Sequence, residues 1–220
     1  MRKVCFLALL ALMAFLQSAA ENKDKKKDWI ELFNGKDLSG WHLRKADRPN
    51  GWKVLPDGVY ENTKPSMDLM TDREFYDFQL HVEFKIPPGS NSGVYMRDKY
   101  EIQIFDSYGK PIAINGCGAL YRKVAPAQNV CGPAGEWQSF DMTFVGRRLT
   151  VFHNQKKIHD NIDVGPTGTG AASNREDGPG PLRLQGDHDS VSFRNLRIRP
   201  ISKEEGERLL KRYSAIEELK

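Results

Sequence analysis

The sequence has few cysteines, no clustered histidines and almost no excess charge, and each of these features narrows the possible functions. It contains 3 Cys and 5 His in 220 residues, and its formal net charge is +4. There is no basic stripe with interleaved aromatic residues, the pattern typical of nucleic-acid binding. We therefore expect no nucleic-acid partner. Four histidines show no metal-ligand spacing such as His-x-x-x-His; they are His42, His81, His153 and His159.

The sequence has only one long hydrophobic run, and it lies at the N-terminus. Residues 4–16 are apolar, follow Arg2 and Lys3, and precede the small residues 18–20. This arrangement predicts a secretory signal peptide over residues 1–20, cleaved near Ala20. The run is shorter than the roughly 20 apolar residues of a membrane-spanning helix. We therefore expect a secreted or periplasmic protein with no membrane association in its mature form.

A short charged segment comes after the predicted signal peptide. Residues 21–28 include the run "KDKKKD", which predicts a solvated linker. Without Arg2 and Lys3, 31 of the 33 basic residues remain against 29 acidic residues. The mature chain is therefore close to neutral.

Two cysteines, Cys117 and Cys131, remain outside the predicted signal peptide. In an oxidising compartment they can form a disulfide, which would stabilise the fold by about 3 kcal/mol in the chain-entropy model. The alternative is a pair of buried free thiols, because a chain of this length can bury a sufficient core without a disulfide. Neither cysteine has a neighbouring histidine that would indicate a nucleophile.

Strand-like segments dominate the rest of the sequence. Residues 76–86 alternate between apolar and polar side chains, which predicts a strand with one buried face. Residues 94–97 and 100–105 predict a hairpin whose turn contains Asp98 and Lys99. Further strands are predicted within residues 51–62, 137–145, 148–154, 156–161, 181–185 and 190–200, the last with a bulge near Arg194 or Asn195.

Only the C-terminal residues 202–220 have a helical pattern. Their apolar stripe consists of Leu209, Leu210, Tyr213 and Ile216. Two long loops, residues 106–136 and 165–180, are rich in Gly and Pro, and loops of this length are often functional. Many short strands with one helix predict an all-β jelly-roll sandwich over residues 29–201.

The stretch "YEIQIFD", residues 100–106, has an unusual polar face. Glu101 and Gln103 share one face of the predicted strand, and apolar residues fill the other. If the apolar faces point inward, Glu83 and Arg97 also point outward from consecutive strands, and we expect the four to cluster. Two carboxylates, a guanidinium and an amide suit sugar binding or acid/base chemistry. The alternative is a solvated network of ion pairs.

Residues in two loops support a site at this face. Tyr108, Tyr121, Asn129 and Trp137 lie on or beside the loop 106–136, and flat aromatic rings beside polar groups are typical of carbohydrate sites. The segment "QGDHDS", residues 185–190, gathers charged residues in one turn. There His188 could act as a base or metal ligand oriented by a neighbouring carboxylate. The alternative is an ordinary polar turn.

Several motifs, in order along the chain, resemble the 3-keto-disaccharide hydrolase domain family, long described as a domain of unknown function. They are "LFNGKDLSGW", "FQLHVEFKIPPGSNSGVYMR", "YEIQIFD", "GCGALY", "GEWQSFDMTFVGRRLTVFHN" and "GPLRLQGDHDSVSFRNLRIRP", between residues 32 and 200. The resemblance implies a concanavalin A-like jelly roll that is secreted by bacteria degrading carbohydrates. It also implies cleavage of glycosides whose C3 hydroxyl has been oxidised to a ketone.

A weaker similarity to jelly-roll β-glucanases concerns the same strand. Their Glu-x-Asp-x-x-Glu motif corresponds here to Glu101-x-Gln103-x-x-Asp106. One acid is replaced by an amide and the last acid is shorter, which disfavours ordinary retaining hydrolysis by two carboxyl groups. A C3 ketone removes the need for such a pair, because it acidifies the C2 proton and allows elimination of the C1 substituent.

This chemistry gives roles to the candidate residues. Glu101 or His188 would be the base, and Arg97 or a divalent metal ion held by carboxylates and His188 would stabilise the enolate. The predicted substrate-binding residues are Glu83, Asn91, Gln103, Asp106, Tyr121, Glu136, Trp137 and Gln185. The expected partner is an oligosaccharide or glycoside substrate. The alternative function is a non-catalytic carbohydrate-binding module of the same fold.

Overall fold

The computed structural model of the chain describes residues 28–170 and 177–218. The predicted signal peptide and nearly all of the predicted linker lie outside these residues, so both stay predictions. By its internal contacts the chain divides into residues 1–30 and residues 31–220, and the second unit carries the fold described below. Within the described residues, no helix combines the length and apolar character that a membrane crossing requires.

The described residues form thirteen strands and one helix. These are β1 (Ile30–Glu31), β2 (Trp41–Leu43), β3 (Trp52–Val54), β4 (Tyr60–Asn62), β5 (Leu69–Phe75), β6 (Phe78–Lys85), β7 (Asn91–Met96), β8 (Tyr100–Phe105), β9 (Gln138–Val145), β10 (Arg148–His153), β11 (Lys156–Asp163), β12 (Gly180–Leu184), β13 (Val191–Pro200) and α2 (Lys203–Glu217).

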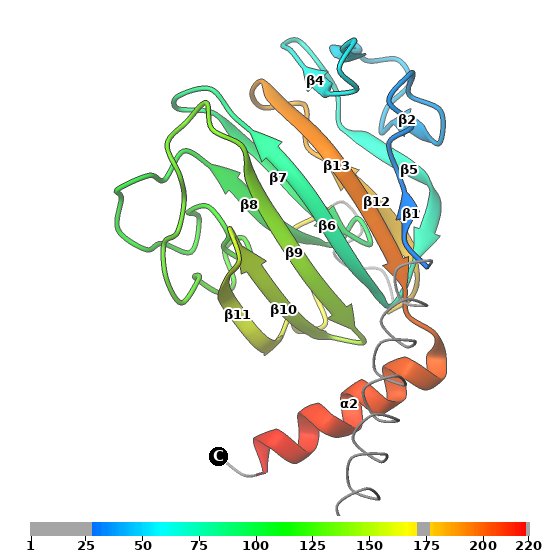
Figure 1. Ribbon diagram of the computed structural model, residues 1–220, viewed down its shortest axis with the longest axis vertical. Coiled ribbons are helices and arrows are strands. Elements are labelled where there is room, and N and C mark those ends of the chain that lie inside the picture. Colours follow the sequence, from blue (N-terminus) through cyan, green and yellow to red (C-terminus); the bar gives the residue numbers. More distant parts are fainter. Residues whose placement is uncertain (1–27, 171–176, 219–220) are drawn as a thin grey trace, which may run out of the picture. The chain divides into compact units, whose positions relative to one another are not determined.

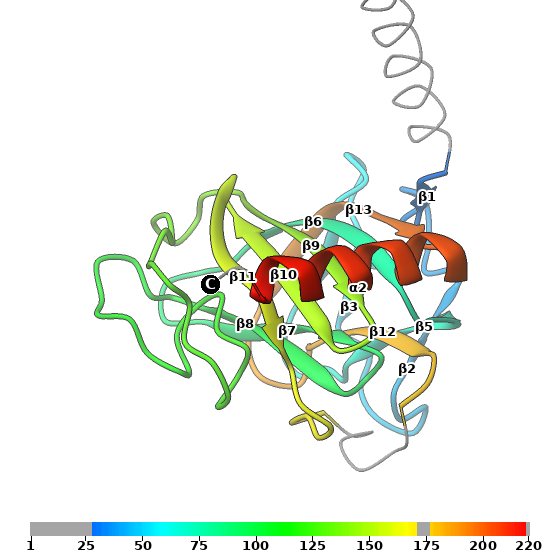
Figure 2. The same ribbon diagram turned by 90° about the horizontal axis from the view of Figure 1, so that it is seen from below.

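The strands build two antiparallel sheets that pack face to face. The larger sheet has the strand order β11-β10-β9-β6-β13-β4-β3, and the five-stranded sheet has the order β2-β5-β12-β7-β8. Figure 1 shows the strands of the larger sheet in front. Figure 2 shows the two layers, with β7, β8 and β12 on one side and β6, β9 and β13 on the other. The predicted all-β jelly-roll sandwich is confirmed.

The core lies between the two sheets and is rich in aromatic residues. Strand β6 alternates as predicted, with Phe78 and Phe84 buried and the intervening polar residues facing outward. From the opposite sheet, Val94, Ile102 and Ile104 are fully buried against this layer. At roughly 25 cal/mol for each Å² of apolar surface removed from water, such side chains supply most of the favourable free energy of folding.

A bulge in β13 keeps both halves of that strand in the core. The register with β6 shifts between Arg194 and Arg197, and Asn195 has a positive φ of 50°. Because of this extra residue, Phe193 and Leu196 both point into the core although they are three positions apart. The bulge predicted near these positions is confirmed.

Helix α2 crosses one end of the sandwich, as Figure 2 shows. Ser202 caps its N-terminus by accepting a hydrogen bond from the Glu205 backbone N–H. Gly206 is buried in its first turns, where a Cβ atom would lie 2.7 Å from an oxygen of Asp77. The glycine therefore allows the helix to pack closely on the turn before β6.

Candidate functional site

The outer face of the five-stranded sheet contains buried polar residues. Glu101 and Gln103 on β8 are each only 3% exposed, although they point away from the core. The alternation of β8 places Tyr100, Ile102 and Ile104 on its inner face. The two polar side chains are therefore neither in the core nor freely solvated, and they form the floor of a site.

A glycine opposite these residues makes room for the carboxylate. Gly93 on β7 pairs with Gln103. A Cβ atom at Gly93 would lie 2.5 Å from Oε1 of Glu101, a distance that no real Cβ contact shows. The Glu101 side chain therefore lies over the Gly93 backbone, and any larger residue there would displace it.

Neutral hydrogen-bond donors hold the Glu101 carboxylate. The hydroxyl of Tyr95, its direct partner across the hairpin, hydrogen-bonds to Glu101. In the amide orientation that satisfies its neighbours, Gln103 donates to Oε1 of Glu101 at 3.0 Å and to the Ser92 carbonyl at 3.0 Å. The prediction that Glu101 and Gln103 lie side by side is confirmed.

The burial of Glu101 makes it a stronger base than an ordinary glutamate. Burial raises the pKa of its carboxyl group, and this effect outweighs the hydrogen bond from Tyr95 and the nearby charges of Arg183 and His188. Burial also raises the pKa of Tyr95, as does the neighbouring Glu101 charge. Tyr95 therefore stays protonated and able to donate.

A buried arginine lies beside this pair. The guanidinium of Arg183, on β12, stacks on the Tyr95 ring at 3.4 Å from the ring centre. Its Nε lies 2.6 Å from Oδ1 of Asp98, and its Nη1 lies 2.6 Å from Oδ2 of Asp68. Because both carboxylates are almost fully buried, these ion pairs fix the geometry of this sheet face.

The same Asp68 positions the loop of residues 185–190. Its Oδ1 accepts hydrogen bonds from the backbone N–H groups of Gly186 at 3.0 Å and Asp187 at 3.3 Å. From β4, the Asn62 amide donates to the carbonyls of Gly186 at 2.9 Å and Asp189 at 3.2 Å. The loop is therefore held at both ends by buried side chains.

His188 is carried by this loop and is oriented by its neighbour. Its Nδ1 lies 2.6 Å from Oδ1 of Asp187, and its side chain is 48% exposed. It lies close enough to Glu101 to act electrostatically on that carboxylate. The structure therefore brings the two predicted acid/base candidates to the same site, with the His188 Nε2 available to a ligand.

Gln185 and Tyr121 complete the predicted part of the site. The Gln185 amide donates to the Tyr95 hydroxyl at 3.3 Å. Its Oε1 is buried and has no partner within the described residues, although Gln185 is only 7% exposed. A buried acceptor of this kind needs a ligand or an ordered water. The Tyr121 N–H donates to the Glu101 carbonyl, and its neighbour Leu120 bridges to Ile102, so Tyr121 lies on the polar face.

Asn91 and Asp106 lie at the margin of the site. In the same orientation of Gln103, its amide oxygen lies 3.1 Å from the side-chain amide of Asn91, and the Asn91 backbone N–H donates to Oδ2 of Asp189 at 3.0 Å. Asp106 follows β8 and accepts a hydrogen bond from the Gly89 N–H at 2.8 Å. Asn91 thus joins the floor to the 185–190 loop, whereas Asp106 stabilises a turn.

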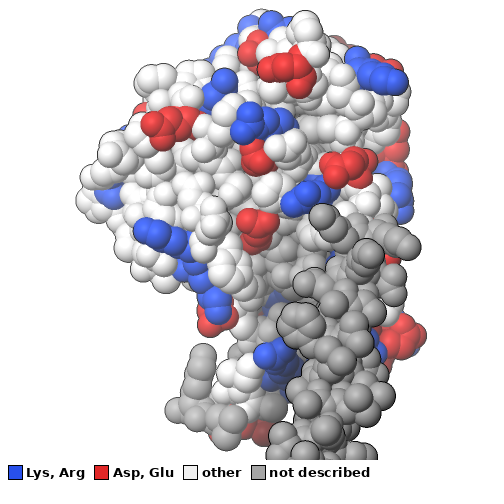
Figure 3. All heavy atoms as spheres, viewed as in Figure 1, with Lys and Arg blue, Asp and Glu red and all other residues white. Residues whose placement is uncertain are grey.

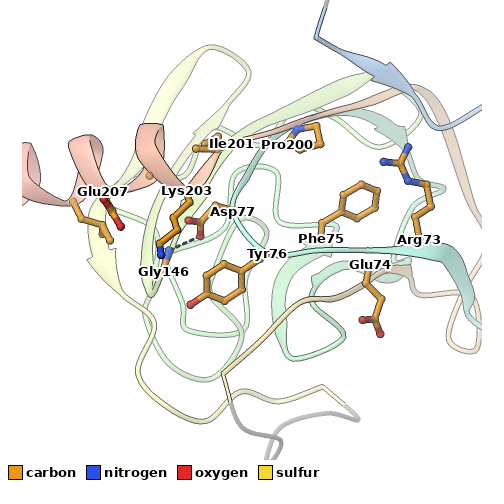
Figure 4. A pocket seen from close by; sticks show the side chains of 12 residues that line it. Arg73, Glu74, Phe75, Tyr76, Asp77, Gly146, Pro200, Ile201, Lys203 and Glu207 are labelled. Atoms are coloured by element: carbon orange, nitrogen blue, oxygen red, sulfur yellow. Dashed lines mark hydrogen bonds between the residues drawn. The ribbon is translucent and has the colours of Figure 1, made fainter.

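The prediction for Arg97 is wrong. The turn is centred on Arg97 and Asp98, which both have positive φ angles of 56° and 51°, so Arg97 is not a strand residue. Its guanidinium is 1% exposed and lies between the rings of Tyr76 and Phe144. It pairs with Asp77, which lines the pocket beside helix α2 in Figure 4. Arg97 therefore cannot stabilise an enolate above Glu101.

The prediction that Glu83 clusters with Glu101 is also wrong, because β6 belongs to the larger sheet. There Glu83 accepts hydrogen bonds from Arg194 at 2.6 Å and Asn195 at 2.7 Å. Trp137 lies under the Arg194 guanidinium at 4.1 Å and lines the same groove as Glu83, next to the exposed Glu136 in the chain. Figure 3 shows acidic and basic side chains interspersed over this face.

The two cysteines lie next to each other in the loop of residues 106–136. Both are buried free thiols. Hydrogen bonding between them, followed by burial, raises the pKa of Cys117, and the same hydrogen bond lowers the pKa of Cys131. The two thiols are close enough to interact, and their pairing in a disulfide stays a prediction.

The described residues contain no group of three or more His, Cys, Asp or Glu side chains that could hold a metal ion. Glu101 and His188, the predicted metal ligands, are therefore not part of such a group.

Sequence reasoning missed Tyr95, Arg183 and Asp68. Tyr95 could have been found, because it has the same strand phase as Gly93 and faces Glu101 across the hairpin. Asp68 and Arg183 are 115 residues apart, and no local pattern connects them.

The fold and this polar floor define a jelly-roll sandwich with a carboxylate-containing site on its five-stranded sheet. The sequence model of the 3-keto-alpha-glucoside-1,2-lyase-like domain family matches residues 28–199, and the chain belongs to this family. The predicted resemblance is confirmed.

Known proteins resemble the chain over most of its fold. A 3-keto-disaccharide hydrolase of Bacteroides thetaiotaomicron is 26% identical, over 58% of this chain and 55% of the relative, so the chain spans about half the length of that curated relative. A proposed glycosyl hydrolase of Parabacteroides distasonis has a crystal structure with a TM-score of 0.66 and 30% identity, covering 79% of this chain and 84% of that chain. A second proposed glycosyl hydrolase of the same organism has a crystal structure with a TM-score of 0.68 and 23% identity, covering 82% of this chain and 97% of that chain. At this identity the likeness supports the fold alone.

Proposed function

We propose that the protein is an enzyme that cleaves 3-keto-glycosides by removing the C2 proton and eliminating the C1 substituent, after which water adds. The observation that carries this proposal is the buried Glu101 carboxylate, whose pKa is raised and whose partners are neutral donors. A base poised in this way suits abstraction of a proton next to a ketone. The family membership supports the same class of reaction.

The proposed reaction has two stages. Glu101 takes the C2 proton, and the electron pair of that bond forms the enolate of the C3 ketone. The enolate re-forms the ketone, and the C1–O bond breaks with its electrons on the leaving oxygen. The product has a C1=C2 double bond conjugated with the C3 ketone. Water then adds its oxygen to C1 and a proton to C2, so the net result is hydrolysis.

His188 is the proposed acid for the leaving oxygen. Its hydrogen bond with Asp187 at 2.6 Å orients the ring for this transfer. The Gln185 amide, which also donates to the Tyr95 hydroxyl, is a donor available to the ketone oxygen, and the Arg183 charge on the same face of the sheet favours the anionic enolate. These groups take the part first given to Arg97, and no step requires a metal ion.

The test compares a 3-keto-disaccharide with its unoxidised parent in D2O. Wild-type protein should cleave only the keto sugar and place deuterium at C2. Glu101→Gln should lose both exchange and cleavage by about 10²–10⁴-fold. His188→Ala should lose cleavage while retaining more of the exchange, because the acid acts after the base. Parallel assays with a chelator report whether a divalent metal takes part.

Two outcomes would overturn the proposal. Full activity of both Glu101→Gln and His188→Ala would exclude the assigned roles. Absence of cleavage and exchange, with saturable sugar binding that survives Glu101→Gln, would establish the alternative of a carbohydrate-binding module.

A further inference from the structure

A pocket with a basic lining lies on the far side of the 185–190 loop. It has a volume of about 280 Å³ and lies between the segment after β2 and the segment before β5. Arg44, Lys45 and Arg48 line it together with Asp187 and the apolar side chain of Met67. Three cations therefore share a small cavity with one lining carboxylate.

The charges of this pocket are not balanced by its neighbours. Arg44 is within 3.1 Å of Oδ2 of Asp68 and 3.7 Å of Oδ2 of Asp187. Asp68 already pairs with Arg183, so its charge is shared between two guanidinium groups. Across residues 28–170 and 177–218, the exposed side chains of Lys45 and Arg48 have no ion-pair partner. The pocket thus keeps unpaired positive charge at its mouth.

The pocket adjoins the candidate active site at Asp187. One oxygen of Asp187 contacts His188 at 2.6 Å, and the other faces Arg44 at 3.7 Å. The backbone of the pocket is also tied to the site, because the Arg44 N–H donates to the Asp68 carbonyl at 2.9 Å. A ligand that reaches from His188 past Asp187 would therefore place its next group among these cations.

We propose that this pocket binds an anionic substituent of the substrate, a carboxylate or a sulfate group, so that acidic 3-keto-glycosides are preferred. The inference rests on the proposed function and specifies its substrate class. Arginine and lysine bind such oxygens through charge-assisted hydrogen bonds, which are roughly twice as strong as neutral ones. The small volume admits one substituent, whereas a nucleic-acid backbone would need an extended basic surface.

The test is a double substitution that removes the two unpaired cations, Lys45→Gln with Arg48→Gln. The matched control is Lys156→Gln with Lys211→Gln, which removes the same charge from exposed positions on β11 and α2. Turnover is compared on a neutral 3-keto-disaccharide and on the same compound carrying a uronate. We expect the pocket variant to lose about tenfold or more of kcat/KM on the uronate alone, and the loss should shrink at high salt.

Binding measurements keep this proposal separate from the proposed function. If neither compound is turned over, calorimetry with the uronate disaccharide, the neutral disaccharide and inorganic sulfate still tests the pocket. Tighter binding of the uronate that disappears in the pocket variant supports the proposal. Equal effects on charged and neutral sugars, no effect on either, or binding of sulfate without discrimination between the two sugars would overturn it.

Discussion

Glu83 and Glu101 occupy equivalent positions on two strands of the same sandwich, yet their environments are opposite. Each alternates with buried apolar residues and faces away from the core. The Glu83 side chain is 21% exposed and bonds directly to the Arg194 guanidinium. Glu101 is 3% exposed, and its bonded partners are the neutral Tyr95 and Gln103.

The electrostatic consequence follows from these partners. Burial alone raises the pKa of both carboxyl groups, but hydrogen bonds from Asn195 and Arg194 outweigh it at Glu83 and lower its pKa. At Glu101 burial prevails and the pKa is raised. The comparison teaches that a strand pattern locates an outward carboxylate, whereas its bonded partners decide whether it is an ion pair or a base.

The strongest test of this comparison is a pair of isosteric substitutions. Glu101→Gln should reduce turnover of a 3-keto-glycoside by about 10²–10⁴-fold, because the base is removed while the shape is kept. Glu83→Gln should stay within about twofold of wild type, because its ion pair lies on the other sheet. Equal losses in the two variants would show that Glu101 acts through folding rather than chemistry.

The arginines of the two faces should differ in stability. Arg183→Met leaves the buried Asp68 and Asp98 without this cation, and we expect a loss of about 3–5 kcal/mol in the free energy of unfolding. Arg194→Met removes a partner of Glu83 that is 39% exposed, and the expected loss is about 1 kcal/mol or less. Denaturant titration measures both, and similar values would contradict the contrast between the faces.

Substitutions at two glycines test how closely the position of the Glu101 carboxylate controls turnover. Gly93→Ala places a Cβ atom on the Glu101 carboxylate and should cost about 100-fold in turnover, because the base is displaced by about 1 Å. Gly178→Ala is the matched control, because a Cβ atom there meets nothing within 4 Å. If both variants keep the wild-type melting temperature, the difference in turnover is due to geometry at the site.

The sequence predicted the fold better than the site. Alternation identified β6, and the phase change in residues 190–200 located the bulge of β13, because both are local patterns. Strand β5 was missed, since its exposed middle residues hide any alternation. The assignment of Glu83 to the site failed because alternation fixes the face of a strand but not the sheet to which the strand belongs.

Within the site, local pairs were predictable and distant ones were not. The spacing of Glu101 and Gln103 and the cluster around His188 were visible in the sequence. The error at Arg97 was a turn shifted by one residue, which is enough to reverse a side chain. The contact between Arg183 and Asp68 joins strands far apart in the chain, and only the folded sheet brings it together.

The smallest predicted effect is the pH dependence of stability, which should have opposite signs for the two glutamates. The raised pKa of Glu101 means that the folded state holds its proton more tightly than the unfolded chain. Its contribution to stability is therefore lost as pH rises above the ordinary value of 4.5 and through the raised pKa. Glu83 has a lowered pKa, so it stabilises the fold above 4.5 and loses this contribution as pH falls through the lowered pKa.

Melting temperatures of Glu101→Gln, Glu83→Gln and wild type between roughly pH 3 and pH 8 measure this difference. Relative to wild type, Glu101→Gln should gain stability as pH rises. Glu83→Gln should be less stable than wild type at neutral pH and approach it in acid. Parallel curves for the two variants would mean that both carboxylates sit in equivalent environments, and the proposed base at Glu101 would lose its physical basis.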